Sequence, residues 1–303
     1  MAAAMRLVVT GRHGQLATAL AERAAGRGIT LVACGRPELD LEHPAGISPA
    51  LSALTPDIIV NAAALTAVDR AESEPERAHA INAAGAGAVA TTAAMLGIPV
   101  IQISTDYVFD GSATKPYRES DAVAPLGVYG QSKLAGERAV MTACADHAIL
   151  RTSWVFSATG QNFVRTMLRL AETRSEISVV ADQIGRPTPA DDLAEAVLGV
   201  AANLLAERAE PALRGIFHVG GTGDAISWAG LAEAIFAERV RRGGSAVGVR
   251  TIGTADYPTP ARRPAWSVLD GARLKEIHGI ILPDWRIGLA RCMDRLMITE
   301  QAP

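Results

Sequence analysis

The sequence predicts an α/β fold, a doubly wound parallel (Rossmann-type) sheet with a smaller C-terminal domain. Short apolar, β-branched runs alternate with helical patterns through the first half of the chain, and this periodicity becomes less regular after residue 157. We assign residues 1–157 and 176–219 to the Rossmann-type domain, and residues 158–175 and 220–303 to the second domain. At 303 residues the chain is long enough for two unequal domains.

The composition is that of an ordinary globular protein. The sequence is 49% hydrophobic and 20% charged, whereas a disordered chain has fewer apolar and more charged residues. The net charge of −3 comes with no basic run and no interleaving of basic and aromatic residues. This pattern argues against binding to nucleic acid or to an anionic membrane. We therefore expect a small-molecule ligand.

The three cysteines, Cys34, Cys144 and Cys292, are widely spaced and form no Cys-x-x-Cys pair. Their spacing argues against a disulfide framework and against a zinc site, so we expect a cytoplasmic protein. The first six residues lack the long apolar run of a signal peptide, and the alanine-rich stretch 83–103 contains interrupting polar residues and a proline. We therefore expect neither a signal peptide nor a membrane span.

The first predicted strand, residues 5–10, runs into Gly11 and Gly14, and a helical pattern begins at Leu16. A dinucleotide site requires this order of strand, glycine turn and helix. Gly11 allows a tight turn, Gly14 lets the backbone approach a pyrophosphate, and free N–H groups of the helix bind it. The spacing departs from Gly-x-Gly-x-x-Gly, with Ala17 in place of the third glycine. The motif predicts nucleotide binding, although a bare Gly-x-x-Gly also occurs in simple turns.

The second predicted strand, residues 29–35, is followed by Arg36, where an NAD-selective protein usually carries an acidic residue. An arginine here can accompany a 2′-phosphate, so it favours NADPH over NADH. A solvated surface arginine is the alternative. Asp40 is a candidate for the adenine side of the site or for a turn cap.

The third predicted strand, residues 57–64, ends in three alanines at 62–64. Such small side chains allow a cofactor to lie across the strand end, or a tight contact between helix and sheet. An alanine-rich helical region follows at about 75–95, and then a fourth strand at 99–105. The loop 106–127 is long and rich in turn residues, which is typical of a functional loop.

Ser104 and Thr105 stand at the carboxyl end of the fourth strand, where ligands bind in an open parallel sheet. The next segment, 128–140, is predicted to be a helix that carries Tyr129 and Lys133 four residues apart, on one face. A phenol titrates near pH ~10, and a neighbouring ammonium favours its ionised form. Tyr129 is therefore the candidate acid–base, with a pKa lowered by Lys133. Alone, Tyr-x-x-x-Lys is a weak pattern that also occurs on solvated helices.

The remaining elements are predicted from apolar runs and helical periodicity. We expect strands at 147–156, 177–182, 215–219 and 247–252, helices at 162–172, 191–207, 227–241 and 284–297, and a proline-rich loop at 256–264. The sequence contains no repeat of fixed period.

Several motifs together resemble the extended short-chain dehydrogenase/reductases and, within them, the dTDP-4-dehydrorhamnose reductases. The resemblance covers nearly the whole chain. The most specific motifs are Ser-Thr-Asp-Tyr-Val-Phe-Asp-Gly at 104–111 and Arg263-Pro264 with Ser267 and Leu269. The others are Gly11–Leu16, Glu38–Leu41, Asn61–Glu72, Ile81-Asn82, Pro116-Tyr117 with Glu119, Tyr129–Lys133 with Gly136-Glu137, Arg151–Trp154 and Asp182–Thr188.

The resemblance implies reduction of the C4 ketone of dTDP-4-dehydro-L-rhamnose to dTDP-L-rhamnose with hydride from NADPH or NADH, a step toward O-antigen and cell-wall polysaccharides. It implies that Tyr129 donates the proton, that Lys133 binds the nicotinamide ribose and lowers the Tyr129 pKa, and that Thr105 hydrogen-bonds the reacting oxygen. The implied cofactor set is Gly11, His13, Gly14, Gln15, Leu16, Arg36, Asp40, Leu41, Ala62, Ala63, Ala64, Tyr129 and Lys133. The implied sugar set, which a C-terminal substrate domain would complete, is Val68, Asp69, Ser104, Asp106, Tyr107 and Trp154.

Some members of this family bind Mg²⁺ through glutamates at a dimer interface. Here the matching region reads Ala190-Asp-Asp-Leu193, and Gln15 is not an acid. Acids at a helix start also complement the helix dipole. We therefore predict no metal site, and a monomer or homodimer that binds a dTDP-sugar but neither nucleic acid nor a membrane.

Two other functions stay open. A nucleotide-sugar epimerase or dehydratase of the same superfamily would keep its NAD bound and need no external NADPH. A non-catalytic NADP-binding subunit of a larger complex is the other alternative. Such a subunit often lacks the tyrosine or the lysine, and this chain has both.

Overall fold

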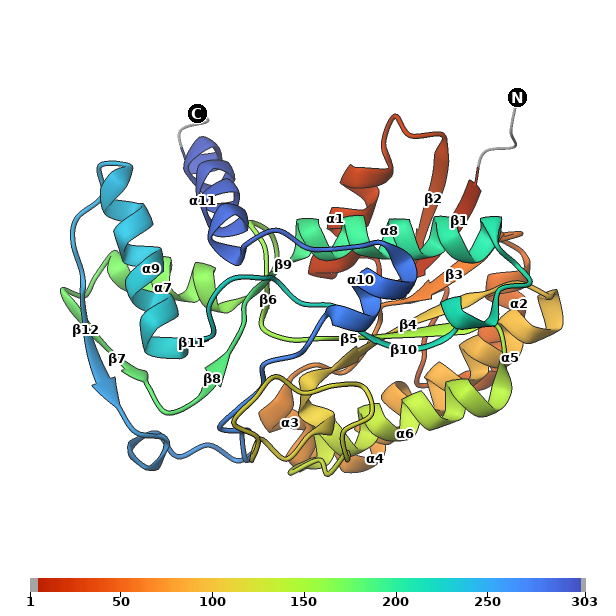
Figure 1. Ribbon diagram of the computed structural model, residues 1–303, viewed down its shortest axis with the longest axis horizontal. Coiled ribbons are helices and arrows are strands. Elements are labelled where there is room, and N and C mark those ends of the chain that lie inside the picture. The colour runs from red at the N-terminus through yellow and green to blue at the C-terminus, as the bar shows by residue number, and fades with distance from the viewer. Residues whose placement is uncertain (1–4, 301–303) are drawn as a thin grey trace.

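The first unit of the protein is built on one parallel sheet (Figure 1). In the computed structural model, which describes residues 5–300, six strands lie in the order β2-β1-β3-β4-β5-β10, and every neighbouring pair is parallel. They are β1 (Met5–Thr10), β2 (Ile29–Cys34), β3 (Ile58–Asn61), β4 (Val100–Thr105), β5 (His147–Thr152) and β10 (Gly215–His218). The strand order reverses between β1 and β3, which is where doubly wound sheets bind ligands. The predicted fold class is confirmed.

Helices cover both faces of this sheet (Figure 1). One face packs against α1 (Gln15–Ala24), α8 (Ala190–Ala206) and α10 (Ala272–His278), and the other against α2 (Ile47–Ser52), α5 (Ala86–Leu96) and α6 (Val128–Ala143). Alternate strand residues serve the two cores, so Leu7 and Val9 pack toward α1 whereas Val8 packs toward α2. Burial on both faces explains why the strands are continuous apolar runs in the sequence.

The alanine-rich region predicted at 75–95 is one uninterrupted helical segment. It consists of α4 (Pro75–His79), a π-helical segment (Ala80–Gly85) and α5, and a separate short helix, α3 (Val68–Ser73), precedes it. Short 3₁₀ turns occupy Pro44–Gly46, Asp106–Val108, Pro211–Leu213 and Thr254–Asp256. Across the described residues, no helix is long and apolar enough to cross a lipid bilayer.

The second unit lies at one end of the sheet and has its own core, which includes Phe156, Phe236 and Trp285 (Figure 1). It contains α7 (Phe163–Ala171), α9 (Trp228–Arg241), α11 (Trp285–Glu300) and a parallel strand pair, β7 (Glu176–Val180) with β12 (Gly248–Ile252). Two short strand pairs connect the units: β6 (Val155–Phe156) with β9 (Thr188–Pro189), and β8 (Ile184–Gly185) with β11 (Ile226–Ser227).

Two predicted strands end earlier than expected. The strand predicted at 147–156 stops at Thr152, because the chain turns at Trp154, whose φ is 49°, and continues as β6 in another sheet. The strand predicted at 57–64 stops at Asn61, so the three alanines lie in the loop that follows it. In both places an apolar run continues past the strand because the turn itself is partly buried.

The strand predicted at 177–182 is present as β7, but it pairs with β12 and lies outside the six-stranded sheet. Our assignment of 176–219 to the Rossmann-type domain did not specify the sheet to which this strand belongs, and the assignment stays a prediction. The boundary between the two domains stays a prediction. The sequence did not predict α2, α3 or α10, because helices of six or seven residues are too short to show a clear period.

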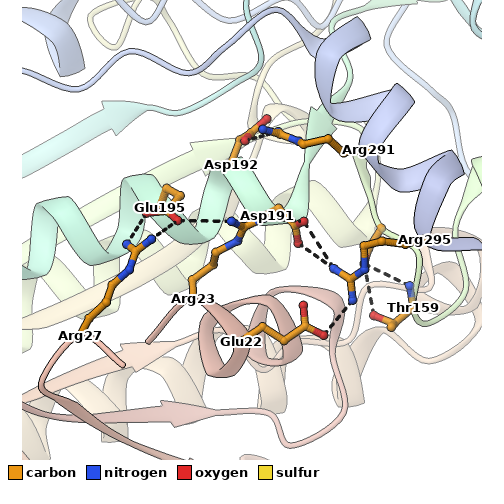
Figure 2. Close-up of polar contacts among 10 residues, drawn as sticks. Glu22, Arg23, Arg27, Thr159, Asp191, Asp192, Glu195, Arg291 and Arg295 are labelled. Carbon is orange, nitrogen blue, oxygen red and sulfur yellow. Dashed lines mark hydrogen bonds and ion pairs between the residues drawn. The ribbon is translucent and has the colours of Figure 1, made fainter. Parts of the chain in front are cut away.

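Ion pairs join the last helix to the first unit (Figure 2). We call them the three-helix network: it comprises Glu22 and Arg23 of α1, Arg27 of the turn that follows α1, Asp191, Asp192 and Glu195 of α8, and Arg291 and Arg295 of α11. Asp191 accepts from Arg23 at 2.9 Å and from Arg295 at 3.4 Å. The remaining pairs are Arg295 with Glu22 at 2.8 Å, Arg27 with Glu195 at 2.6 Å, Arg23 with Glu195 at 3.7 Å, and Arg291 with Asp192.

Candidate functional site

A cavity of about 690 Å³ lies at the carboxyl ends of the first strands. All the predicted cofactor residues except Tyr129 and Lys133 line it: Gly11, His13, Gly14, Gln15, Leu16, Arg36, Asp40, Leu41, Ala62, Ala63 and Ala64. These residues come from the ends of three strands and from the start of α1, so the parallel sheet brings them together. Their role as cofactor ligands stays a prediction.

The backbone of the cavity floor suits a dinucleotide. Gly11 turns the chain after β1 with a φ of 94°, a conformation that favours glycine. Gly14 precedes α1 without a side-chain cap, so the first N–H groups of α1 stay available to a pyrophosphate. Thr10 Oγ1 donates to Asn61 Oδ1 at 2.6 Å and accepts from Ala63 N at 3.1 Å, which fixes the alanine loop against the glycine turn.

Four arginines line the cavity, of which the sequence predicted only Arg36. The other three already have carboxylate partners: Arg12 pairs with Glu38 at 2.8 Å, Arg70 with Glu74 at 2.6 Å, and Arg77 with Glu42 at 2.9 Å. Arg36 is exposed, and no carboxylate among the described residues pairs with it. Its guanidinium is therefore the one most available to a phosphate.

Asp40 and Gln15 each have a second contact besides the cavity. Asp40 Oδ1 accepts from Glu42 N at 3.0 Å, so both hypotheses for Asp40, a turn cap and a cavity residue, agree with the geometry. Gln15 Oε1 accepts from Asn162 Nδ2 at 3.0 Å. Asn162 caps α7, so this bond ties the cavity wall to the second unit.

Tyr129 and Lys133 project from α6 beside this cavity, as the helical spacing predicted. Both side chains are buried, and the Tyr129 hydroxyl is hydrogen-bonded to the side chain of Thr105. Lys133 Nζ donates to Ile103 O at 2.7 Å, and Ile103 lines the cavity. The three residues predicted to be catalytic therefore meet at the end of β4.

The pKa of Tyr129 differs from the prediction. Burial raises it to about 12, and the hydrogen bond with Thr105 only partly opposes this rise. Lys133 does not lower it, because its ammonium points to Ile103 O, and burial lowers the pKa of Lys133 itself to about 8. The expected lowering of the Tyr129 pKa is wrong: the phenol stays protonated at neutral pH, as a proton donor must.

Asn82, in the π-helical segment, fixes the position of α6. Its side chain accepts from Leu65 N at 2.8 Å and donates to Leu65 O at 3.1 Å and to Ser132 Oγ at 3.0 Å. A Cβ at Gly136 would lie 2.0 Å from Asn82 O, so only glycine permits this approach. The resemblance marked Asn82 and Gly136, but no spacing rule in the sequence indicated that they contact each other.

Two of the residues predicted to bind the sugar, Tyr107 and Val68, pack against Tyr129. The ring of Tyr107 meets that of Tyr129 edge to face at 5.4 Å, and Val68 packs in the same cluster. Asp69 accepts from Arg263 at 2.7 Å, so the proline-rich loop 256–264 is tied to α3 beside this cluster. Arg263 is a site residue to which the sequence gave no role.

Trp154 is held on two sides, since its Nε1 donates to Ser267 Oγ at 3.1 Å and its ring stacks on Trp228 at 3.5 Å.

Asp106 is buried beside Thr105, whose Oγ1 donates to Asp106 Oδ1 at 3.0 Å, and burial raises the pKa of Asp106 to about 7. Ser104 differs from the other members of the sugar set. Its hydroxyl donates to Glu137 at 2.5 Å, behind Thr105.

No group of three or more metal-ligating side chains occurs among residues 5–297 of the described chain. Asp191 and Asp192, the acids at the start of α8, both pair with arginines in the three-helix network. The Asp192 carboxylate is buried, and burial raises its pKa.

A family profile and full-length relatives agree on one family for this chain. The profile of the RmlD substrate binding domain matches residues 5–298. The dTDP-4-dehydrorhamnose reductase of Sinorhizobium fredii is 49% identical over 97% of this chain and 98% of its own length, and that of Escherichia coli is 41% identical over 97% and 99%.

Solved structures agree with these sequences. A dTDP-4-dehydrorhamnose reductase from Clostridium acetobutylicum superposes with a TM-score of 0.88 at 35% identity, covering 97% of this chain and all of that chain. The Bacillus anthracis enzyme, solved in complex with NADP, gives a TM-score of 0.87 at 35% identity, covering 96% and 99%. The chain therefore belongs to the RmlD family, the family of the dTDP-4-dehydrorhamnose reductases.

Proposed function

We propose that this protein reduces the C4 ketone of dTDP-4-dehydro-L-rhamnose to dTDP-L-rhamnose with NADPH. The observation that carries the proposal is the contact of Tyr129 with Thr105 at the end of β4, beside a cavity whose backbone suits a dinucleotide. The names of the relatives support the choice of sugar. The bound cofactor would supply the hydride.

The chain's own residues supply the proton and the orientation. Tyr129 is protonated at neutral pH because its pKa is about 12, so it can donate its proton to the oxygen that forms at C4. Thr105, hydrogen-bonded to Tyr129, orients that oxygen and the phenol together. Lys133, anchored on Ile103 at the cavity wall, offers its remaining N–H donors to the ribose. Val68, Asp69, Asp106, Tyr107 and Trp154 surround the sugar.

The reaction is tested by following the absorbance of NADPH with the 4-keto sugar as substrate. Tyr129→Phe should lower kcat by ~10²- to 10⁴-fold, the usual contribution of a general acid, with little change in the Kd for NADPH. Tyr257→Phe, an exposed tyrosine, is the matched control and should keep its activity. Sugar turnover without NADPH oxidation would instead assign the protein to the epimerases or dehydratases.

We also propose that Arg36 selects NADPH. Its guanidinium lines the cavity without a carboxylate partner, so it is available to the 2′-phosphate. Arg36→Ala should raise KM for NADPH more than KM for NADH. The difference should correspond to about 1 kcal/mol or more of lost binding free energy. Arg77→Ala, which removes an already paired arginine from the same cavity, should change both KM values alike. If Arg36→Ala changed KM for NADPH and KM for NADH equally, Arg36 would be a surface residue with no part in cofactor selection.

The cytoplasm is the compartment that we propose, since Cys34, Cys144 and Cys292 are free and buried apart from one another. The oligomeric state that we propose is a monomer or a homodimer. Sedimentation of the purified protein with and without Mg²⁺ tests both the oligomer and the predicted absence of a metal site. A mass that rises with Mg²⁺ would overturn that prediction.

A further inference from the structure

Glu137 lies on α6 one helical turn beyond Lys133, and the mechanism above gives it no role. Its side chain is 1% exposed and accepts three hydrogen bonds: from Ser104 Oγ at 2.5 Å, Arg151 Nε at 2.8 Å and Arg151 Nη2 at 2.7 Å. An ion pair buried this deeply pays a large desolvation cost, and apolar residues of similar volume often stabilise a fold as well. The charge of Glu137 therefore calls for an explanation other than stability.

Strand β4 holds Glu137 and Lys133 side by side. The carbonyl of Ile103 accepts from Lys133 Nζ, and the hydroxyl of the next residue, Ser104, donates to Glu137. The two α6 residues are four positions apart, so their side chains share one face of the helix. Ile103 lines the cofactor cavity, so the carboxylate is fixed near the point where the ammonium reaches that cavity.

Arg151 approaches the same carboxylate from β5. It is the register partner of Ser104 on β4 and of His218 on β10, and its guanidinium lies 5.2 Å from the centre of the Phe109 ring. Its Nη1 has no hydrogen-bond partner in the described structure. Glu137 thus lies between two buried basic side chains, Lys133 and Arg151.

Other charged groups around α6 do not substitute for Glu137. Glu72 of α3 binds Val128 N at the start of α6, and Arg77 of α4 turns to Glu42 and Glu74. The π-helical segment and α5 contain no charged residue. Asp106 acts on the pKa of Tyr129 but not on that of Lys133, which burial lowers to about 8 and which Glu137 alone raises by its charge.

We propose that Glu137 is a positioning residue for Lys133, whose carboxylate keeps the lysine ammonium protonated and fixed against β4 beside the cofactor cavity. The inference rests on the proposed function, which gives Lys133 its task at the nicotinamide ribose. A neutral lysine would lose one donor and its charge, so cofactor binding would weaken. Arg151 in turn holds the Glu137 carboxylate in place through two hydrogen bonds.

The test is the affinity for NADPH, measured by its fluorescence without any sugar, as a function of pH. In the unmodified protein the affinity should fall as pH rises through about 8, where Lys133 loses its proton. In Glu137→Gln the fall should begin ~1 pH unit or more lower, the size of shift that a close opposite charge produces. Near pH ~5.5, where the lysine of every variant is mostly protonated, the affinities should agree.

Two further variants separate charge from structure. Glu137→Gln combined with Arg151→Met removes both charges and leaves no unpaired guanidinium, so it should regain stability while its binding curve still falls at the lower pH. Arg138→Gln removes an exposed charge from the same helix and should leave the curve where it was. If Glu137→Gln fails to fold, the double variant carries the test.

A ¹³C NMR titration of the Lys133 side chain gives a second measurement, whose midpoint should drop in the double variant. An unshifted midpoint and an unshifted binding curve in that variant would overturn the proposal. An equal shift in Arg138→Gln would do the same. Failure of the proposed function would look different. The unmodified protein would then not oxidise NADPH when the sugar is added, while the binding curves measured without sugar would still shift between variants.

Discussion

Two sets of ion pairs in this protein, the pair Glu137–Arg151 and the three-helix network, differ in burial and in what they contact. Glu137 and Arg151 are 1% and 3% exposed and lie near Lys133, the lysine proposed to bind the cofactor. In the three-helix network, Arg23 and Arg295 are 34% and 37% exposed, and their partners hold α1, α8 and α11 together (Figure 2). Charges act strongly on each other where water is excluded and weakly where water and salt screen them. The buried pair can therefore set a protonation state, whereas the exposed network mainly orients helices.

Breaking the buried pair should give the largest effect on stability. Arg151→Met leaves the Glu137 carboxylate buried without its partner, so the free energy of unfolding should fall by about 3–5 kcal/mol. Adding Glu137→Gln should recover most of this loss, since the uncompensated charge is then gone. Urea unfolding of the three proteins measures both values. A loss below about 1 kcal/mol in Arg151→Met would place this pair with the exposed ones.

Lowering the pH should give the second-largest effect on stability, through the buried His218. His218 is fully buried against Arg151, its Nδ1 contacts Tyr117 O at 2.9 Å, and burial followed by the Arg151 charge lowers its pKa to about 3. The unfolded chain takes up this proton near pH ~6.5, so stability should be lost as pH falls below that value, by about 2 kcal/mol at pH ~5.

Urea unfolding at the two pH values checks the acid effect against variants. His218→Leu removes the group that titrates differently in the folded and unfolded states, so its stability should depend less on pH in this range. His43→Gln changes an exposed histidine and should keep the full dependence of the unmodified protein. Equal pH dependence in all three proteins would show that the loss comes from other groups.

The exposed network should give the smallest effect. Asp191→Asn removes the central acceptor for Arg23 and Arg295. Asp191 itself is 15% exposed, but both arginines reach solvent, and pairs with a solvated partner typically contribute less than about 1 kcal/mol. About 1 M salt should erase the difference from the unmodified protein, because the Debye length is then only ~3 Å. The same salt should leave the loss in Arg151→Met nearly unchanged. A salt-independent loss in Asp191→Asn would mean that this carboxylate acts as a buried group.

The cofactor side of the site was predictable because its signals are local. Gly11 and Gly14 directly follow one strand, Arg36 follows the next, and the alanines at 62–64 follow the third. A parallel sheet places the carboxyl ends of its strands at one edge. Residues that follow different strands in the sequence therefore become neighbours in space. Tyr129 and Lys133 were predictable for the same reason, since one helical turn relates them.

The sugar side depends on contacts between distant segments. Arg263 reaches Asp69 across 194 positions, and Trp154 stacks on Trp228 from the second unit. No periodicity encodes such contacts, because they form only when the second unit docks on the sheet. Burial is equally invisible in the sequence. The spacing of Tyr129 and Lys133 correctly predicted a shared face, yet the Tyr129 pKa moved in the opposite direction because desolvation outweighs the neighbouring charge.

The π-helical segment Ala80–Gly85 bears on how the gene can vary in length. A π turn contains one more residue than an α turn, so deletion of a single codon there would leave a regular helix with α4 and α5 still aligned. The deletion would move Asn82 away from its position between Leu65 and Ser132, so its hydrogen bonds to both residues would be lost. The reading frame and the fold would survive such a deletion, while α6, which carries Tyr129, would lose an anchor.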